Sequence, residues 1–139
     1  MPGMMVDSYG RKVTGLRIAL TSRCNLRCLY CHHEGEVEPN GEISDEMVIG
    51  VAQAAAALGV RSLKLTGGEP LLRRGLAGLI ARMPPQMKIS LTTNGIYLAE
   101  QAASLARVGL DRVNVSLDSL RSDTYRAITG GREKDLVRV

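Results

Sequence analysis

The chain has 139 residues, a length typical of one domain. Hydrophobic residues make up 45% of the sequence, with four Tyr but no Phe or Trp, so the core must be aliphatic. No apolar stretch approaches membrane-spanning length, and the net charge of +4 is dispersed rather than gathered into basic runs. We therefore expect neither a membrane nor a nucleic acid polymer as partner. The positive charge suits an anionic ligand or a solvated surface.

Strand and helix patterns alternate along the chain. Strands are expected at residues 16–21, 62–66, 88–92 and 112–117. Helices are expected at residues 45–58, 76–81, 98–108 and 123–129, and another begins near residue 133. Ser44 and Ser122 are suited to cap two of these helices, and Gly59 and Gly109 to end two of them. This order predicts an α/β fold with parallel strands.

Each predicted strand has one apolar and one polar face. In the first strand, Leu16 and Ile18 point one way, whereas Arg17 points the other, and the same split recurs in the other three. Parallel strands covered by helices on both faces are normally apolar throughout. The polar face therefore predicts a wet or ligand-filled concavity, as inside a partial barrel, with a face open to water as the alternative. The segments that follow the strands form the candidate site, because reactive groups gather at the C-terminal ends of parallel strands.

All three cysteines of the chain, Cys24, Cys28 and Cys31, lie in one short segment after the first predicted strand. Three thiolates can hold three irons of a cubane 4Fe–4S cluster and leave the fourth iron open to a ligand. A zinc site would draw on His32 or His33, but neighbouring residues rarely both turn onto one tetrahedral metal. Disulfides are disfavoured by the odd number of thiols in one loop, which fits a reducing, cytoplasmic environment.

Two motifs in this order carry a resemblance to a known superfamily. The spacing Cys24-x-x-x-Cys28-x-x-Cys31, with Tyr30 before the last cysteine, is followed by Gly-Gly-Glu-Pro at residues 67–70. Together they resemble the radical S-adenosylmethionine superfamily. Further segments extend the resemblance, through nearly the whole chain, to its GTP 3′,8-cyclase family of molybdenum cofactor biosynthesis. These segments are residues 7–11, 16–28, 65–73, 91–95, 113–120 and 128–130.

The resemblance implies a partial parallel (β/α) barrel of the radical S-adenosylmethionine type, truncated after about four β/α units. Residues 1–139 would then be the N-terminal part of a single core domain, with the C-terminal domain absent. In the family that missing region carries a second 4Fe–4S cluster on three more cysteines, whereas every cysteine here belongs to the first motif. The chain is therefore not expected to be competent alone, and it is a candidate for homo-oligomer formation.

The resemblance also implies roles for individual residues. The ligands of the one cluster are Cys24, Cys28 and Cys31. The contacts to S-adenosylmethionine are Tyr30, Gly67, Gly68, Glu69 and Ser116. The contacts to the substrate GTP are Arg17, Lys64 and Thr92. An aromatic packed under the loop is the alternative for Tyr30, and a turn-stabilising carboxylate is the alternative for Glu69.

The implied activity is that of a lyase. A low-potential electron donor drives reductive cleavage of S-adenosylmethionine, and the resulting 5′-deoxyadenosyl radical takes hydrogen from C3′ of GTP, whose C3′ then bonds to C8. Two alternatives stay open. The chain could belong to another radical S-adenosylmethionine enzyme, such as a peptide-modifying one, or it could be a non-catalytic iron–sulfur module.

Overall fold

The computed structural model of the protein describes residues 3–32 and 42–139. Its strands form one open, four-stranded parallel sheet in the order β1-β2-β3-β4. They are β1 (Gly15–Ala19), β2 (Ser62–Thr66), β3 (Lys88–Thr93) and β4 (Arg112–Val115). The helices are α1 (Asp45–Ala57), α2 (Leu76–Ala81), α3 (Leu98–Arg107), α4 (Ser122–Thr129) and α5 (Glu133–Leu136), with a 3₁₀ turn η1 (Pro70–Leu72). The predicted alternation and the parallel sheet are confirmed.

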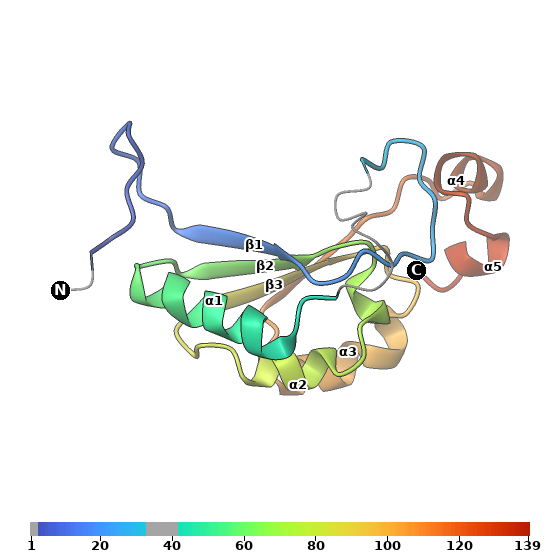
Figure 1. Ribbon diagram of the computed structural model, residues 1–139. Coiled ribbons are helices and arrows are strands. Elements are labelled where there is room, and N and C mark those ends of the chain that lie inside the picture. Colours follow the sequence, from blue (N-terminus) through green and yellow to red (C-terminus); the bar gives the residue numbers. More distant parts are fainter. Residues whose placement is uncertain (1–2, 33–41) are drawn as a thin grey trace.

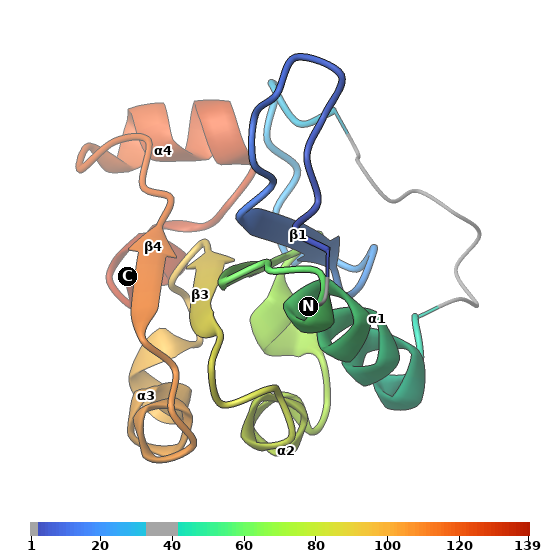
Figure 2. The same cartoon turned by 90° about the vertical axis from the view of Figure 1, so that its left-hand side faces the viewer.

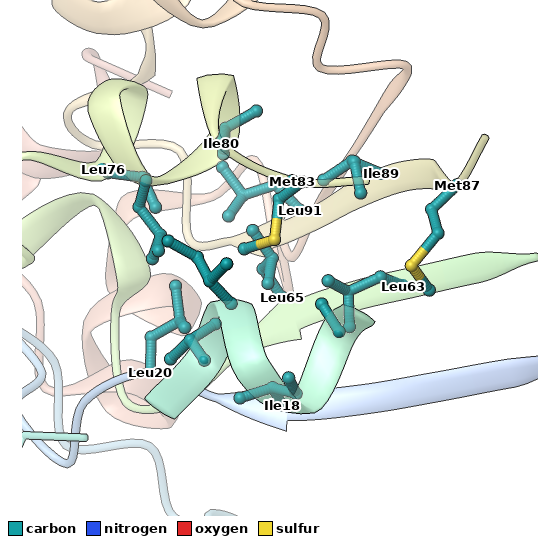
Figure 3. Packing of buried hydrophobic residues seen from close by; sticks show 14 of the residues in the cluster. Ile18, Leu20, Leu63, Leu65, Leu76, Ile80, Met83, Met87, Ile89 and Leu91 are labelled. Atoms are coloured by element: carbon teal, nitrogen blue, oxygen red, sulfur yellow. The ribbon is translucent and has the colours of Figure 1, made fainter. Parts of the chain in front are cut away.

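Helices α1, α2 and α3 lie together on one side of the sheet (Figures 1 and 2). The apolar side chains of β2 and β3 point into this layer, and Leu63, Leu65 and Leu91 are fully buried (Figure 3). Met83 and Met87, which follow α2, fill the remaining gaps of this aliphatic core. The helix layer therefore covers one face only, as the alternating strands predict.

The opposite face of the sheet is polar. Arg17 of β1 is exposed on it, and Lys64 of β2 and Thr92 of β3 are half-buried there. Strand register aligns Arg17 with Lys64, because the two residues are direct partners in the β1–β2 pair. The polar alternation of separate strands thus becomes one continuous surface.

Helix α4 does not join the layer formed by α1, α2 and α3. It lies past the C-terminal ends of the strands, on the polar side of the sheet (Figures 1 and 2). Tyr125 and Thr129 are its buried side chains, a stripe too narrow to cover a sheet. The expected cap of this helix was wrong in detail, because Arg121 is the N-cap residue and Ser122 is the first helical residue. Ser44 does cap α1, accepting a hydrogen bond from the Met47 N–H.

Strand β4 lies at an edge of the sheet and pairs with β3 among the described strands. Val115 and Leu117 keep 44% and 40% of their surface exposed, so this edge is only partly covered. Val139 lies close by, since a Cβ on Gly95 would touch the side chains of both Val115 and Val139. No helix in the described ranges has the length and apolar character needed to cross a membrane.

Candidate functional site

The loop after β1, residues 20–32, is called the cysteine loop here, and it lies backbone against backbone with the turn after β2. The Gly68 N–H donates to the Thr21 carbonyl at 2.7 Å, and the Glu69 N–H donates to the Arg23 carbonyl at 2.7 Å. A Cβ on Gly68 would overlap the Arg23 carbonyl, and one on Gly67, whose φ is +139°, would lie 2.5 Å from the Thr21 oxygen. Both positions therefore require glycine if the loop is to stay on the end of the sheet.

All three cysteines open on one cavity of about 280 Å³. Cys24 and Cys31 are exposed and Cys28 is half-buried, and all three are free thiols. The other lining residues are Ser22, Leu26, Arg27, Tyr30, His32, Gly67 and Gly68. His33, the second histidine considered for zinc, lies outside the described residues.

The donor set fits a cubane cluster. Within residues 3–32 and 42–139, no three Cys, His, Asp or Glu side chains are grouped as ligands of a single metal ion. A cubane binds each cysteine at a separate corner, so its ligands stand apart around a shared space. Three thiols line one cavity here and supply three such ligands.

Burial raises the pKa of the Cys24 and Cys28 thiols above the usual range. For Cys24 the Leu26 N–H, which donates to Sγ at 3.5 Å, partly offsets this effect. Both groups are therefore protonated near neutral pH, and iron must displace their protons on binding.

Iron loading should consequently be faster at higher pH. Going from about pH 7 to about pH 8.5 increases the thiolate fraction of both groups, and only the thiolate is a ligand. We expect the initial rate of anaerobic cluster assembly, followed by visible absorbance, to rise several-fold. Protein with alkylated thiols is the control and should load at neither pH. A rate that falls over this range would contradict the expectation.

Tyr30 joins the cysteine loop to the segment after β4. Its hydroxyl donates to the Asp118 carboxylate and lies 2.9 Å from each oxygen. Desolvation, and then this hydrogen bond, raise the pKa of Tyr30, so the hydroxyl stays a donor. Tyr30 lines the cavity of the cysteines and is 55% exposed. Sequence reasoning missed this pairing with Asp118, because no local pattern connects positions 88 residues apart.

Glu69 is 1% exposed and is held by three donors. Its Oε1 accepts from the Leu71 N–H at 2.9 Å and from the Thr93 hydroxyl at 2.7 Å. Its Oε2 accepts from the Asn94 N–H at 2.8 Å. The Asn94 side chain in turn donates to Asn25 of the cysteine loop at 2.8 Å. This geometry favours the turn-stabilising alternative for Glu69, which joins β2, β3 and the loop.

Glu69→Gln should destabilise the fold although it is nearly isosteric. An amide nitrogen cannot accept a hydrogen bond, so either the Asn94 N–H or the pair of donors at Oε1 loses its partner. Leaving a buried donor unsatisfied costs about 1–3 kcal/mol. Urea unfolding followed by circular dichroism measures the change, with the exposed Glu133→Gln as control. Equal midpoints for the two variants would contradict this role.

The predicted cofactor contacts divide into two groups. Tyr30, Gly67 and Gly68 line the cavity of the cysteines. Neither Glu69 nor Ser116 is among the lining residues. Ser116 directly follows β4, and its N–H donates to the carbonyl of Thr93 at the end of β3. Contact of any of the five with a cofactor stays a prediction.

A second cavity, of about 400 Å³, lies on the polar face of the sheet. The three predicted substrate contacts, Arg17, Lys64 and Thr92, all line it. The other lining residues are Ala19, Thr66, Gly67 and Asn114. Neither Arg17 nor Lys64 forms an ion pair with another described residue. Since Gly67 lines both cavities, the cationic one adjoins the cavity of the cysteines.

Comparison with known proteins gives one family and several close relatives. Residues 18–139 match the Radical SAM superfamily. A probable GTP 3′,8-cyclase of Archaeoglobus fulgidus is 57% identical over 130 residues, which are 94% of this chain and 44% of that protein. The GTP 3′,8-cyclase of Streptomyces coelicolor is 46% identical over 142 residues, covering 96% and 42% respectively. The chain thus spans less than half the length of these relatives.

Solved structures show the same fold. Streptococcus suis SuiB bound to S-adenosylmethionine has a TM-score of 0.74 at 21% identity, covering 91% of this chain and 29% of that one. BtrN in complex with AdoMet and 2-DOIA has a TM-score of 0.63 at 18% identity, covering 91% and 55%. At such identities the likeness concerns the fold alone.

Proposed function

Since the chain belongs to the Radical SAM superfamily, we propose that it carries the N-terminal part of a GTP 3′,8-cyclase. The observation that carries the proposal is the adjacency of two cavities, one lined by three cysteines and one by the cationic side chains of Arg17 and Lys64, with Gly67 lining both. The names of the relatives that match nearly the whole chain support the choice of GTP as substrate.

Cys24, Cys28 and Cys31 are the proposed ligands of one 4Fe–4S cluster. When bound, the cluster and S-adenosylmethionine supply a 5′-deoxyadenosyl radical that removes hydrogen from C3′ of GTP, after which C3′ joins C8. The backbone at Gly67 and Gly68 and the ring of Tyr30 would form the cofactor's surroundings, because they share the cavity with the thiols. Glu69 would support this site indirectly, because its hydrogen bonds fix the turn that carries the two glycines.

The second cavity is the proposed substrate pocket. Arg17 and Lys64 offer two positive charges to the phosphates of GTP, and Thr92 offers a hydroxyl. Lys64 acts as a point charge, so a bidentate grip on a phosphate would fall to Arg17. Asn114, which sequence reasoning missed, adds an amide that can both donate and accept hydrogen bonds.

We also propose the localisation, the partners and the domain organisation of the chain. We place it in the cytoplasm, where thiols stay reduced, and expect a low-potential electron donor as partner. Its residues would form the N-terminal part of one core domain, and the partly covered edge at β4 makes self-association an expected property. Its three cysteines suffice for one cluster, so the second cluster implied by the resemblance needs additional sequence.

The test separates cofactor cleavage from cyclisation. Anaerobically reconstituted, dithionite-reduced protein is incubated with S-adenosylmethionine and GTP, and the products are separated by chromatography. We expect slow formation of 5′-deoxyadenosine without the cyclised nucleotide. Titration calorimetry should show GTP binding that Arg17→Ala weakens at least several-fold, with the exposed Arg126→Ala as the matched control.

The outcomes distinguish the alternatives. A protein that assembles a cluster but forms no 5′-deoxyadenosine would be a non-catalytic module. A protein that cleaves the cofactor but does not bind GTP would point to another radical S-adenosylmethionine enzyme, such as a peptide-modifying one. Formation of the cyclised nucleotide by this chain alone would overturn the assignment of that step to additional sequence.

A further inference from the structure

The C-terminal end of α4 is bonded to the cysteine loop on both sides of Cys28. The Arg27 N–H donates to the Thr129 carbonyl, and the Leu29 N–H donates to the Ile128 carbonyl, each at 2.8 Å. The last carbonyls of a helix have no partner within the helix, so they are free to accept from another segment. Here they accept from the backbone N–H groups of the residues directly before and after Cys28.

Thr129 fixes the geometry of this helix end. Its side chain is 1% exposed, and its hydroxyl donates to the Tyr125 carbonyl at 2.7 Å while it accepts from the Gly131 N–H at 3.0 Å. Gly130 then reverses the chain in the left-handed region, at φ 67°. The hydroxyl therefore connects the last turn of α4 to the segment that follows the helix.

Close packing reinforces the contact. A Cβ on Gly131 would lie 2.7 Å from the ring of Tyr125 and 3.0 Å from the Leu26 side chain of the cysteine loop. Tyr125 is 2% exposed, and its hydroxyl has no partner among the described residues, so packing holds this ring in place. The loop, the glycine and the helix thus fit together without space for one further methyl group.

We propose that Thr129 is a positioning residue for Cys28. By fixing the end of α4, it keeps the Arg27 and Leu29 N–H groups on helix carbonyls and directs the Cys28 thiol into the cavity. These two N–H groups then cannot donate to the sulfurs of the cluster. N–H donors to those sulfurs alter the reduction potential of the cluster. Cys24 differs, because the Leu26 N–H already donates to its sulfur. The inference rests on the proposed function in taking Cys28 as a cluster ligand.

Metal-free protein gives the first readout, amide hydrogen exchange at Arg27 and Leu29 measured by NMR. Thr129→Val removes the hydroxyl at nearly constant shape and should speed exchange at both amides about tenfold, as expected for lost buried hydrogen bonds. Thr129→Ser keeps the hydroxyl and should stay within about twofold of the wild type. Thr124→Val is the matched control, since it removes a hydroxyl from the same helix that bonds only to neighbouring Asp123.

Reconstituted protein gives the second readout, the midpoint potential of the cluster from a redox titration followed by EPR. Thr129→Val should raise this potential, because the freed N–H groups can turn toward the sulfurs, whereas Thr129→Ser and Thr124→Val should leave it unchanged. A merely structural role for Thr129 would lower the yield of folded protein without moving the potential, and that result would overturn the proposal.

Native-state exchange of the wild type in a urea series tests the contact without any substitution. The Arg27 and Leu29 amides should become exposed together with the α4 amides, and before the amides of β2 and β3. Fast exchange at Arg27 and Leu29 in the absence of urea, or opening that does not follow α4, would overturn the proposal even if Thr129→Val failed to fold. Failure of the wild type to take up iron would instead contradict the proposed function and leave the exchange result standing.

Discussion

Changing any one of Cys24, Cys28 and Cys31 to Ala should abolish the four-iron signal of the reconstituted protein. Each thiolate holds one corner of the cubane, and an open fourth corner leaves no spare protein ligand to replace it. The three thiols line one cavity, so a single loss leaves two ligands and an exposed cluster that disassembles. Iron and sulfide analysis, together with EPR of the reduced protein, measures the loss, which we expect to be at least about tenfold in cluster content.

His32→Ala is the matched control for these variants. His32 lines the same cavity and directly follows Cys31, but it stands at the wrong spacing to replace a cysteine. Its removal should leave the signal in place. A normal four-iron signal in any cysteine variant would refute the assignment of that cysteine. Loss of the signal in His32→Ala alone would show that an imidazole, and not only thiolates, holds the metal.

Alternation within single strands predicted one polar face of the sheet, with a ligand-filled concavity or a face open to water as the alternatives, and the second cavity lies on that face. Arg17, Lys64 and Thr92 occupy polar positions of three different strands, and parallel register places them on one face. That outcome depends only on the two-residue period of a strand and on helices covering the other side. The position of the cysteine loop could also be predicted from the sequence, because a loop that follows β1 must begin at the C-terminal end of that strand.

Contacts between distant segments could not be predicted in this way. Arg73 and Arg74 suit either an anionic partner or solvent when only the sequence is considered. The structure instead buries Arg73, which donates to the Leu20 carbonyl at 2.8 Å and to Asp45 at 2.7 Å. The place of α4 is a second example, since a helix after a strand is expected on the sheet. It lies elsewhere because the Arg27 and Leu29 N–H groups of the cysteine loop bond to its last carbonyls.

Gly68→Ala should be among the most destabilising single substitutions in this chain. A Cβ at this position overlaps the Arg23 carbonyl and approaches the Ser22 carbonyl, both of which belong to backbone rather than to a flexible side chain. Relief requires the turn after β2 to separate from the cysteine loop, which breaks the Gly68 to Thr21 hydrogen bond. We expect a loss of about 3 kcal/mol in the free energy of unfolding, measured by urea denaturation of the metal-free protein.

Gly50→Ala makes the same chemical change where nothing opposes it. Gly50 lies on the exposed side of α1, and a Cβ there meets no atom within 4 Å. Alanine is the better helix former, so this variant should gain about 0.5–1 kcal/mol. The two variants should therefore move the urea midpoint in opposite directions. If Gly68→Ala were as stable as the wild type, the loop and the turn would not be in contact. Gly68 would then not be held against the loop where it lines the cavity of the cysteines.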